Sequence, residues 1–379
     1  MYLKSLDYSE WIGTQNEWSI KGFTLKKINL IVGKNASGKT RALNIIANVG
    51  NLISGHLPKI YASGNHYLKF NDDDKLEYTL NIEENKIVKE ELVKDNKKLL
   101  DRGLNGIGKI FAVKLNDFIE FQTPDNVLAC LARRDSVQHP YFEELYQWGN
   151  LIRHYHFGSS LGKEHLVAAA TEKIDKIDLK DENNIVNIFR SGFENFKDKF
   201  LELIIADMKE IGYDIEVALY APLINIQVKG IPGGVIGIIV KESDIIKNIN
   251  QLEMSQGMFR ALSLLIHVTY NILTETSPIC ILIDDIGEGL DFERSTALIK
   301  LLMEKAKLYP IQLVMTTNDR FTMNSVPLEY WSVIHRVGSK CKMFNYENSK
   351  KTFEEFAYSG LSNFDFFSTE FYEKGFDEK

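Results

Sequence analysis

One short segment constrains the fold of this chain more than any other. Residues 33–40 read Gly-Lys-Asn-Ala-Ser-Gly-Lys-Thr and satisfy the pattern G-x-x-x-x-G-K-[ST]. An apolar, β-branched run, Ile28–Val32, precedes the segment, and a helix-forming stretch, residues 41–47, follows it. Because strand, loop and helix in this order are the context that the pattern requires, the sequence predicts a phosphate-binding loop in an α/β fold.

The residues of this loop suit the binding of a nucleoside triphosphate. Glycine lets the backbone approach phosphate oxygens closely, and the following helix offers unpaired N–H groups at its N-terminus. Lys39 is expected to reach the β and γ phosphates, and the Thr40 hydroxyl to bind Mg²⁺. The predicted contact set is Gly33, Asn35, Ala36, Ser37, Gly38, Lys39, Thr40 and Arg41. The alternative is a Gly-rich turn without a ligand, which the flanking strand and helix disfavour.

A second apolar run, residues 277–283, ends in two aspartates. Its length and composition are typical of a strand buried on both faces of a parallel sheet, and residues 311–315 form another such run. Asp284 is expected beside the phosphate loop as a ligand of Mg²⁺. Asp285, on the other side, is the candidate general base for an attacking water. A solvated acidic strand end is the simpler alternative.

Residues 254–260 (Met-Ser-Gln-Gly-Met-Phe-Arg) lie about one helix before this strand. With them the chain resembles the ABC ATPase superfamily, whose signature is written LSGGQ, or S-x-G outside the transporters; Ser255 and Gly257 match it. Residues 284–291 resemble the D-E-I-E-x-G-L-H stretch of that superfamily, and residues 314–319 resemble its V-T-T-H-S strand end. An ordinary Ser N-cap is the alternative for Ser255.

The resemblance implies a homodimer or higher oligomer that holds ATP and Mg²⁺ between two chains joined head to tail. Ser255 and Gly257, at a helix N-terminus, would bind the γ-phosphate held by the opposite chain. Two positions depart from the superfamily, since Asp285 replaces its usual glutamate and Asn318 its switch histidine. Because asparagine cannot take up a proton near neutral pH, we predict slow hydrolysis, with Asp285, Lys39 and Asn318 as the catalytic residues.

The N-terminal place of the phosphate loop and the long insertion resemble the RecF, SMC and overcoming-lysogenisation-defect branch of the superfamily. Stand-alone ATPases of this kind resemble subunits of bacterial anti-phage systems, which implies control of a separate effector, a nuclease or a toxin, in antiviral defence or in DNA maintenance. Two other functions stay open. One is a nucleotide-gated scaffold that scarcely hydrolyses ATP, which Asp285 and Asn318 favour; the other is a small-molecule kinase, which would have no use for Ser255.

We predict an ATPase core from both ends of the chain, with an inserted helical lobe and a β-hairpin region. The four predicted parts are residues 1–120, with the phosphate loop; 121–250, a helical insertion with β-hairpins; 251–345, with the signature helix and the acidic and switch strands; and 346–379, an aromatic segment.

Local patterns refine this division. Residues 86–99 are rich in lysine and predict an exposed helix or loop, and residues 193–211 predict one helix. Extended pieces at 213–217, 224–228 and 235–240, interrupted by proline and glycine, predict hairpins.

Several side chains carry weaker signals. Gln122 is our candidate for the glutamine that the superfamily places on the metal, with Gln138 as its competitor. His154 and His156 have the spacing of metal ligands, but a partly buried strand explains that pair better.

Aromatic residues raise two further questions. Trp18 or Phe23 is expected in the core rather than against adenine. The aromatic C-terminal segment, residues 353–376, is expected to dock on the chain's own core rather than on a partner.

Charge and cysteine content limit the partners. The net charge of −7 gives no overall positive field toward nucleic acid or anionic lipid, although a local basic groove stays open. The three cysteines are far apart and are expected to be reduced. The sequence shows no secretory start and no uninterrupted apolar run of about 18 residues, so we expect no membrane contact and a cytoplasmic protein.

Overall fold

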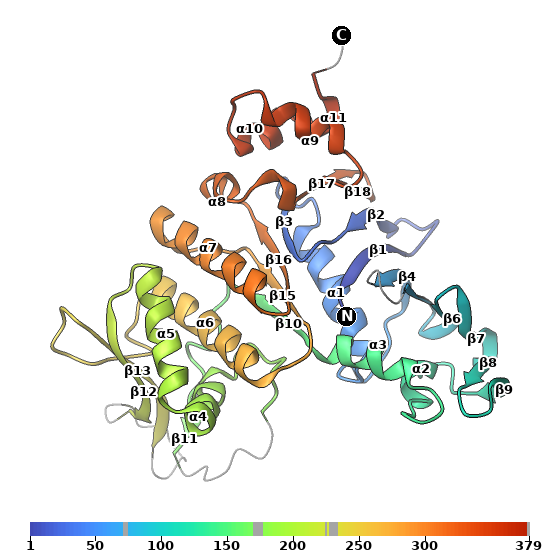
Figure 1. The fold of residues 1–379 in the computed structure, drawn as a ribbon, viewed down its shortest axis with the longest axis horizontal. Helices are drawn as coiled ribbons and strands as arrows, with labels where there is room; N and C mark the ends of the chain where they lie inside the picture. Colours follow the sequence, from blue (N-terminus) through green and yellow to red (C-terminus); the bar gives the residue numbers. More distant parts are fainter. Residues whose placement is uncertain (71–74, 170–176, 224–225, 227–233, 377–379) are drawn as a thin grey trace.

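The computed structural model describes residues 1–70, 75–169, 177–223, 226 and 234–376 (Figure 1). Fourteen of the described strands form one large mixed sheet. From edge to edge these are β10 (Ile152–His156), β15 (Ile279–Asp284), β16 (Ile311–Thr317), β3 (Ile28–Val32), β17 (Trp331–Val337), β18 (Lys340–Asn345), β2 (Trp18–Thr24), β1 (Leu3–Glu10), β4 (Ser63–Phe70), β5 (Leu76–Glu83), β6 (Lys86–Lys94), β7 (Lys97–Arg102), β8 (Ile107–Ala112) and β9 (Asp117–Gln122).

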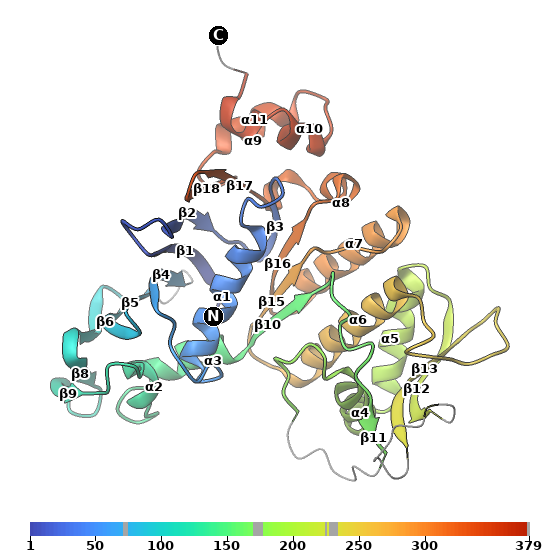
Figure 2. The ribbon, with the colours of Figure 1, turned by 180° about the vertical axis from the view of Figure 1, so that it is seen from behind.

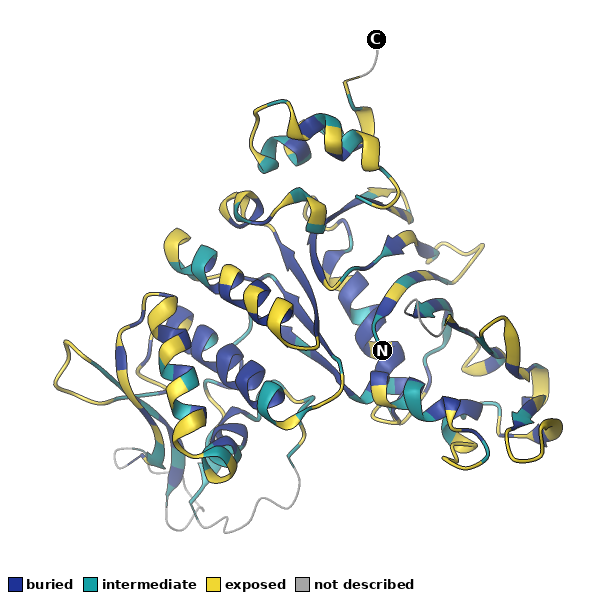
Figure 3. Cartoon of the chain, viewed as in Figure 1, coloured by how far each residue is buried: buried dark blue, intermediate teal, exposed yellow. Residues whose placement is uncertain are grey.

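The five strands β10, β15, β16, β3 and β17 run parallel at one end of this sheet. Helix α1 (Lys39–Ile53) covers one face, and α6 (Gln256–Thr274) and α7 (Phe292–Leu308) cover the other (Figures 1 and 2). Every residue of β3, β15 and β16 is therefore buried, as the apolar runs predicted (Figure 3). Since parallel strands end at the same edge, the phosphate loop and the two aspartates come together there.

The strands from β4 to β9 continue the sheet as antiparallel neighbours, with the short helices α2 (Ala129–Ala132) and α3 (Tyr141–Asn150) and the 3₁₀ turn η1 (Leu104–Gly106). The exposed helix or loop predicted for residues 86–99 is wrong, because β6 and β7 form a hairpin there. Apolar side chains such as Ile87, Leu92 and Leu99 are buried on one side of these strands, whereas the lysines that suggested an exposed segment are partly or fully exposed.

A lobe on the other side of the molecule carries a smaller sheet and two helices against α6 (Figure 1). Its elements are β11 (Val167–Ala168), α4 (Ile185–Phe196), α5 (Asp198–Glu210), β12 (Ile215–Pro222), β13 (Val235–Glu242) and β14 (Ile249–Asn250). The pairing of β12 with β13 confirms the predicted hairpin, although the piece at 224–228 lies largely outside the described residues.

Two expectations for this region were wrong. The single helix predicted over 193–211 is broken at Lys197, whose φ of 49° is left-handed. Residues 121–250, expected as an insertion, also contribute β10 to the main sheet, where it pairs with β15. A strand of five residues between two helical stretches gives a weak periodic signal, and only its pairing with β15 shows where it belongs.

The C-terminal residues dock on the core above β17 and β18, as expected (Figure 1). They follow α8 (Arg320–Ser325) and η2 (Leu328–Tyr330) and form α9 (Lys350–Ala357), α10 (Asn363–Ser368) and α11 (Phe371–Lys374). Phe353, Phe356, Phe366 and Tyr372 are buried, and the Phe366 ring lies 6.4 Å from that of Trp331. We call α9, α10 and α11 the C-terminal cap.

Cysteines and helices bear on two further expectations. All three cysteines are buried and free, which confirms their reduced, structural role. Among the helices of the described segments, none is long and apolar enough to cross a membrane.

Candidate functional site

The phosphate loop links β3 to α1 and depends on its glycines. A Cβ atom on Gly33 would lie 2.5 Å from Cγ2 of Ile334 and 2.6 Å from Oγ of Ser37, so this position has no room for a side chain. Gly38 has a φ of 107°, a conformation that side chains rarely adopt, and it precedes the first residue of α1. Glycine is therefore needed at both positions of the loop, at Gly33 for space and at Gly38 for its backbone conformation.

Two polar groups inside the loop are available to a phosphate. Lys39 is buried, and its Nζ donates to the carbonyl oxygens of Gly33 (2.9 Å) and Lys34 (3.3 Å). Burial lowers the pKa of Lys39, although Asp285 and Asp284 partly offset the effect. The Oγ of Ser37 is buried without a hydrogen-bond partner in the described chain. A buried cation and an orphaned hydroxyl beside a helix N-terminus fit the anionic phosphates of a nucleotide.

The acidic end of β15 is held by the neighbouring strand. Thr316, on β16, donates from Oγ1 to Oδ1 of Asp284 (2.6 Å). The Oγ1 of Thr316 also accepts from the backbone N–H of Asp285 (2.8 Å). Asp284 is buried, whereas Asp285 is half-buried. Asp285 has a φ of 52°, an uncommon value for a residue other than glycine, and such strain is concentrated at functional sites.

Asn318 contacts the candidate general base directly. Its Nδ2 donates to Oδ1 of Asp285 at 3.2 Å. Burial raises the pKa of Asp285, and the nearby Asp284 and Glu288 raise it further, whereas Lys39 opposes them. A carboxylate with a raised pKa binds a proton more readily, as a general base requires.

One cavity of about 440 Å³ gathers most of the predicted site. It is lined by Asn35, Ala36, Gly38, Lys39, Thr40, Arg41, Asp285, Asn318 and Arg336. Arg336 is an addition to the predicted set; it lies on β17 and donates from Nη1 to the Ala36 carbonyl oxygen (3.0 Å). Nothing in the sequence pointed to Arg336, because the contact joins residues far apart in the chain.

The residues present also fit Mg²⁺. No group of three or more His, Cys, Asp or Glu side chains converges as a metal site in the part of the chain that the structure describes. Mg²⁺ beside a nucleotide needs no such cage, because phosphates and water supply most of its ligands. The exposed Thr40 at the start of α1 and the carboxylate of Asp284 are the protein groups expected to hold it.

The structure does not bring Gln122 to this site. Gln122 ends β9, at the far edge of the sheet and ten strands from β3, and its Nε2 donates to the Asn105 carbonyl oxygen (3.2 Å). Gln138, its competitor, lies beside Val113 at the end of β8. The segment beside Asp284 is instead the end of β10, since the Phe157 N–H donates to the Asp284 carbonyl oxygen (3.0 Å).

The histidines of β10 behave as strand residues. His154 and His156 have ring centroids 4.2 Å apart. Burial lowers the pKa of His154 to about 4, and the bond from His156 to Glu182 (3.2 Å) raises the pKa of His156. The partly buried strand that we preferred to a metal site is what the structure shows.

Among the described residues, Ser255 and Gly257 do not line the cavity of about 440 Å³ beside the phosphate loop. Ser255 is exposed and caps α6, accepting from the Met258 N–H (3.3 Å). A Cβ atom on Gly257 would lie 2.5 Å from the Gly289 carbonyl oxygen, so glycine is needed here for packing as well. An exposed cap outside its own chain's cavity is free to meet another chain.

Arg260, near the start of α6, donates hydrogen bonds to two loops beside the site. Its Nε and Nη2 donate to the carbonyl oxygens of Ser159 (2.7 Å) and Gly158, in the loop after β10, and Nη1 donates to that of Glu288 (2.9 Å). Arg260 thereby joins α6 to the loop that follows the two aspartates and to the loop after β10.

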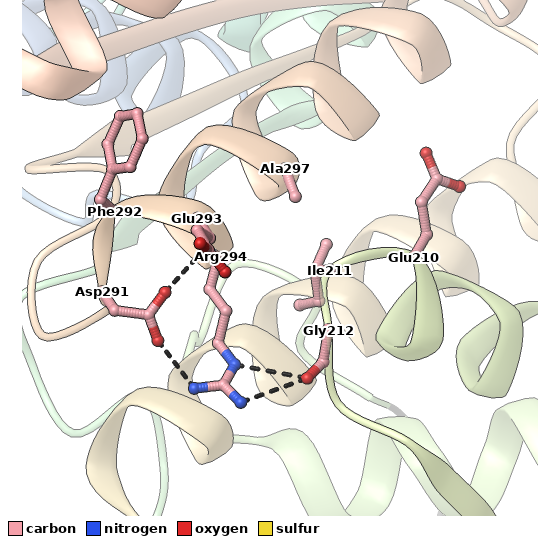
Figure 4. A pocket seen from close by; sticks show the side chains of 8 residues that line it. All are labelled: Glu210, Ile211, Gly212, Asp291, Phe292, Glu293, Arg294 and Ala297. Atoms are coloured by element: carbon pink, nitrogen blue, oxygen red, sulfur yellow. Dashed lines mark hydrogen bonds and ion pairs between the residues drawn. The ribbon is translucent and has the colours of Figure 1, made fainter.

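The loop that follows the two aspartates also contacts the lobe (Figure 4). Asp291 caps α7 by accepting from the Arg294 N–H (2.9 Å), and it pairs with Nη1 of Arg294 (2.7 Å). Arg294 also donates to the Gly212 carbonyl oxygen at the end of α5 (3.2 and 3.4 Å), beside a cavity of about 530 Å³. Arg294 therefore joins the start of α7 to the lobe by hydrogen bonds.

Contacts around the loop settle the role of two aromatic residues. Trp18 and Phe23 are 2% and 0% exposed, so packing rather than adenine stacking is their role. The guanidinium of Arg41 lies 4.3 Å from the centroid of the Trp18 ring and pairs with Glu10.

The C-terminal cap reaches the phosphate loop. Glu370 forms an ion pair with Lys34 (2.7 Å), and both Lys34 and Lys374 lower the pKa of Glu370 to about 2. A cavity of about 430 Å³ lies between the loop and the cap residues Phe367 and Tyr372. The C-terminal cap therefore borders the phosphate loop.

Replacing Thr316 with Val should weaken Mg²⁺-dependent nucleotide binding and lower the free energy of unfolding by roughly 1–3 kcal/mol, because the buried Asp284 carboxylate loses a donor. A Mg²⁺ titration of nucleotide binding and a denaturant titration measure the two effects. Thr317→Val is the matched control, since Thr317 is equally buried but bonds to the Asp319 N–H. An equal Mg²⁺ requirement in both variants would show that Thr316 does not position Asp284.

Comparison with known proteins supports the fold. No protein-family model and no curated protein matches the chain. A crystal structure of an Smc head bound to the C-terminal winged-helix domain of ScpA matches with a TM-score of 0.50 and 14% identity, over 93% of this chain and all of that one. Two other Smc heads have lower TM-scores. The head with an extended coiled coil, bound to a ScpA domain and derived from Pyrococcus furiosus, has a TM-score of 0.47 and 13% identity, over 94% of this chain and 99% of that one. The head from Thermotoga maritima has a TM-score of 0.42 and 14% identity, over 90% of this chain and 98% of that one. The chain has the mixed α/β fold of an Smc head.

Proposed function

We propose that the chain is a slow ATPase whose two copies close head to tail around ATP and Mg²⁺. One observation carries the proposal. The phosphate loop, Asp285 and Asn318 line one cavity, whereas Ser255 is exposed at the start of α6, outside that cavity. The arrangement suits a site that a second chain completes.

Each residue has a defined task in this mechanism. Lys39 and the N–H groups at the start of α1 bind the phosphates, while Thr40 and Asp284 hold Mg²⁺. ATP and Mg²⁺ supply the transferable phosphoryl group and the neutralising charge. Asp285 accepts the proton of the attacking water, and Asn318 orients the Asp285 carboxylate through the bond at 3.2 Å. Ser255 of the opposite chain adds the last donor.

The output of closure is passed to a separate effector in this proposal. The resemblance to anti-phage ATPases suggests a nuclease or a toxin, and the Smc head crystallised with a ScpA domain is a case in which this fold carries a partner. A nucleotide-gated scaffold is the second candidate. It is favoured by Asn318, which cannot relay a proton as a histidine would.

Replacing Ser255 with Arg should leave nucleotide affinity unchanged but abolish ATP-dependent association, because the bulky cation occupies the contact surface. Hydrolysis should fall by about 10²-fold or more, the loss typical of a missing transition-state donor. Ser243→Arg is the control, because Ser243 is an exposed serine like Ser255 but lies in the lobe, away from the start of α6. Phosphate release and nucleotide titrations are the measurements.

Mixing variants tests whether the site is shared. A dimer of one Ser255→Arg chain and one Lys39→Ala chain retains one complete site, built from the loop of the first and the signature of the second. Hydrolysis that reappears on mixing two inactive variants supports the proposal. A Ser255→Arg chain that hydrolyses ATP at full rate as a monomer would favour a single-chain enzyme such as a kinase.

A further inference from the structure

A second cavity, of about 510 Å³, lies at the opposite edge of the parallel strands from the phosphate loop. It is bordered by Tyr146 on α3, by Arg153 near the start of β10, and by Glu275 just after α6. The lobe segment that precedes α4 closes it with Asp178 and Lys180. The mechanism above uses none of these residues.

Arg153 is a buried cation with an incomplete set of partners. It is 3% exposed, and its Nε donates to Oδ1 of Asn271 (2.9 Å) while Nη1 donates to the Asn150 carbonyl oxygen (2.8 Å). Within the described chain, Nη2 has no hydrogen bond, and its ion-pair partner Glu275 lies 3.7 Å away. Arg153 therefore borders the cavity with one guanidinium nitrogen that makes a long ion-pair contact but no hydrogen bond.

Lys180 is a second cation in the same cavity. Its Nζ donates to Oδ1 of Asn51 and to the Gly149 carbonyl oxygen, both at 2.7 Å, which leaves one N–H group. Burial and the nearby Arg153 lower the pKa of Lys180 to about 7, although Asp178 opposes them. Asp178 and Glu275 border the same cavity, but burial is the largest cause of this lowering. The charged ammonium is therefore costly where it lies, and an anion in contact with its remaining N–H group would stabilise it.

We propose that this cavity binds a small molecule through an oxyanion group of the phosphoryl type, held by Arg153 and Lys180. A guanidinium nitrogen and an ammonium group facing one space are the donors that such a group requires. The volume is in the range of small-molecule sites and exceeds what a lone ion needs.

The site joins three parts of the molecule. Arg153 belongs to the sheet, Lys180 to the lobe, and Asn271, which Arg153 contacts, to the C-terminal end of α6. Ser255 caps the other end of that helix, roughly 24 Å from Asn271 at 1.5 Å per residue. A ligand here would fix the lobe against the sheet. The inference does not depend on the proposed ATPase function.

Sulfate is the probe that tests this site, because it does not titrate between pH 6 and pH 8. Calorimetric titrations contain saturating ADP and Mg²⁺, so that the phosphate loop is occupied. The wild-type chain should bind one sulfate, and Lys180→Met should weaken that binding at least tenfold. Lys209→Met, which removes an exposed lysine from the lobe, should bind as the wild type does.

The pH dependence adds a second readout. Because Lys180 loses its proton as the pH rises through about 7, sulfate affinity should fall from pH 6 to pH 8. Lys180→Arg, which keeps the charge, should bind sulfate without that fall. The other titratable or charged groups around Lys180 are Arg153, Asp178, Glu275, Cys280, His56 and Tyr146.

The outcomes separate cleanly. Sulfate binding that disappears in Lys180→Met and returns in Lys180→Arg supports the site. Competition by a nucleoside monophosphate tighter than by inorganic phosphate would identify a phosphate ester as the ligand. Absence of sulfate binding, or equal binding by the wild type and Lys180→Met, would overturn the proposal. Equal binding would place the sulfate at another part of the chain.

Discussion

Asp285→Asn is expected to slow ATP hydrolysis by about 10²- to 10⁴-fold, the usual contribution of a general base, while ATP binding and ATP-dependent association persist. Asparagine keeps the size of the side chain but cannot accept the proton of the attacking water. Single-turnover phosphate release measures the first effect, and molar mass with ATP measures the second. The variant should therefore accumulate as a closed, ATP-bound dimer.

A matched control is available on the neighbouring strand end. Asp319 caps α8 by accepting from the Thr322 N–H (2.7 Å), and asparagine caps helices as well as aspartate does. Asp319→Asn should therefore hydrolyse ATP as the wild type does. If Asp285→Asn also leaves the rate unchanged, Asp285 is not the base, and the nucleotide-gated scaffold becomes the better explanation.

Lys39→Ala is expected to weaken ATP binding by about 100-fold or more, because charge-assisted hydrogen bonds to two phosphates contribute about 1.5–3 kcal/mol each. Association and hydrolysis should be lost with it. Lys34→Ala is the control within the same loop, since the Lys34 side chain is 71% exposed and points to Glu370. Titration with a fluorescent ATP analogue compares the variants. Similar losses in both would mean that the loop acts only through its general positive charge.

The parallel core could be predicted because its sequence signals are local. The runs before Gly33 and Asp284 are continuous and apolar, as burial on both faces requires. Their polar ends then meet at one edge whatever the intervening chain does. The same reasoning located Asn318 after β16, and the structure brings its side chain into contact with Asp285.

The failures involve contacts between distant parts of the chain. Gln122 was the wrong metal candidate because the sequence does not show which strand lies beside β15. That strand is β10, whereas β9, which ends at Gln122, lies at the far edge of the sheet. Arg336 and Glu370 contact the phosphate loop although about 300 residues separate them from it in sequence, and neither belongs to a recognisable motif. Such contacts follow from packing, which periodicity does not report.

Strand content was also underestimated where charges interrupt apolar residues. In β6 and β7, lysine and glutamate alternate with buried residues such as Leu92 and Leu100, and the turn between the strands places Asp95 and Asn96 at positive φ. A charge-rich hairpin on one solvated face looks like an exposed loop when the spacing is irregular. The register shift between Leu92 and Val93 is that irregularity.

The molar mass of the purified chain, measured with and without ATP and Mg²⁺, tests the shared site most directly. The chain has a mass of 43.4 kDa, and we expect ATP with Mg²⁺ to double the measured mass in the wild type. Lys39→Ala and Ser255→Arg should stay at the mass of one chain. A wild-type mass that stays at that of one chain while ATP is hydrolysed briskly would contradict the head-to-tail dimer and leave a single-chain ATPase.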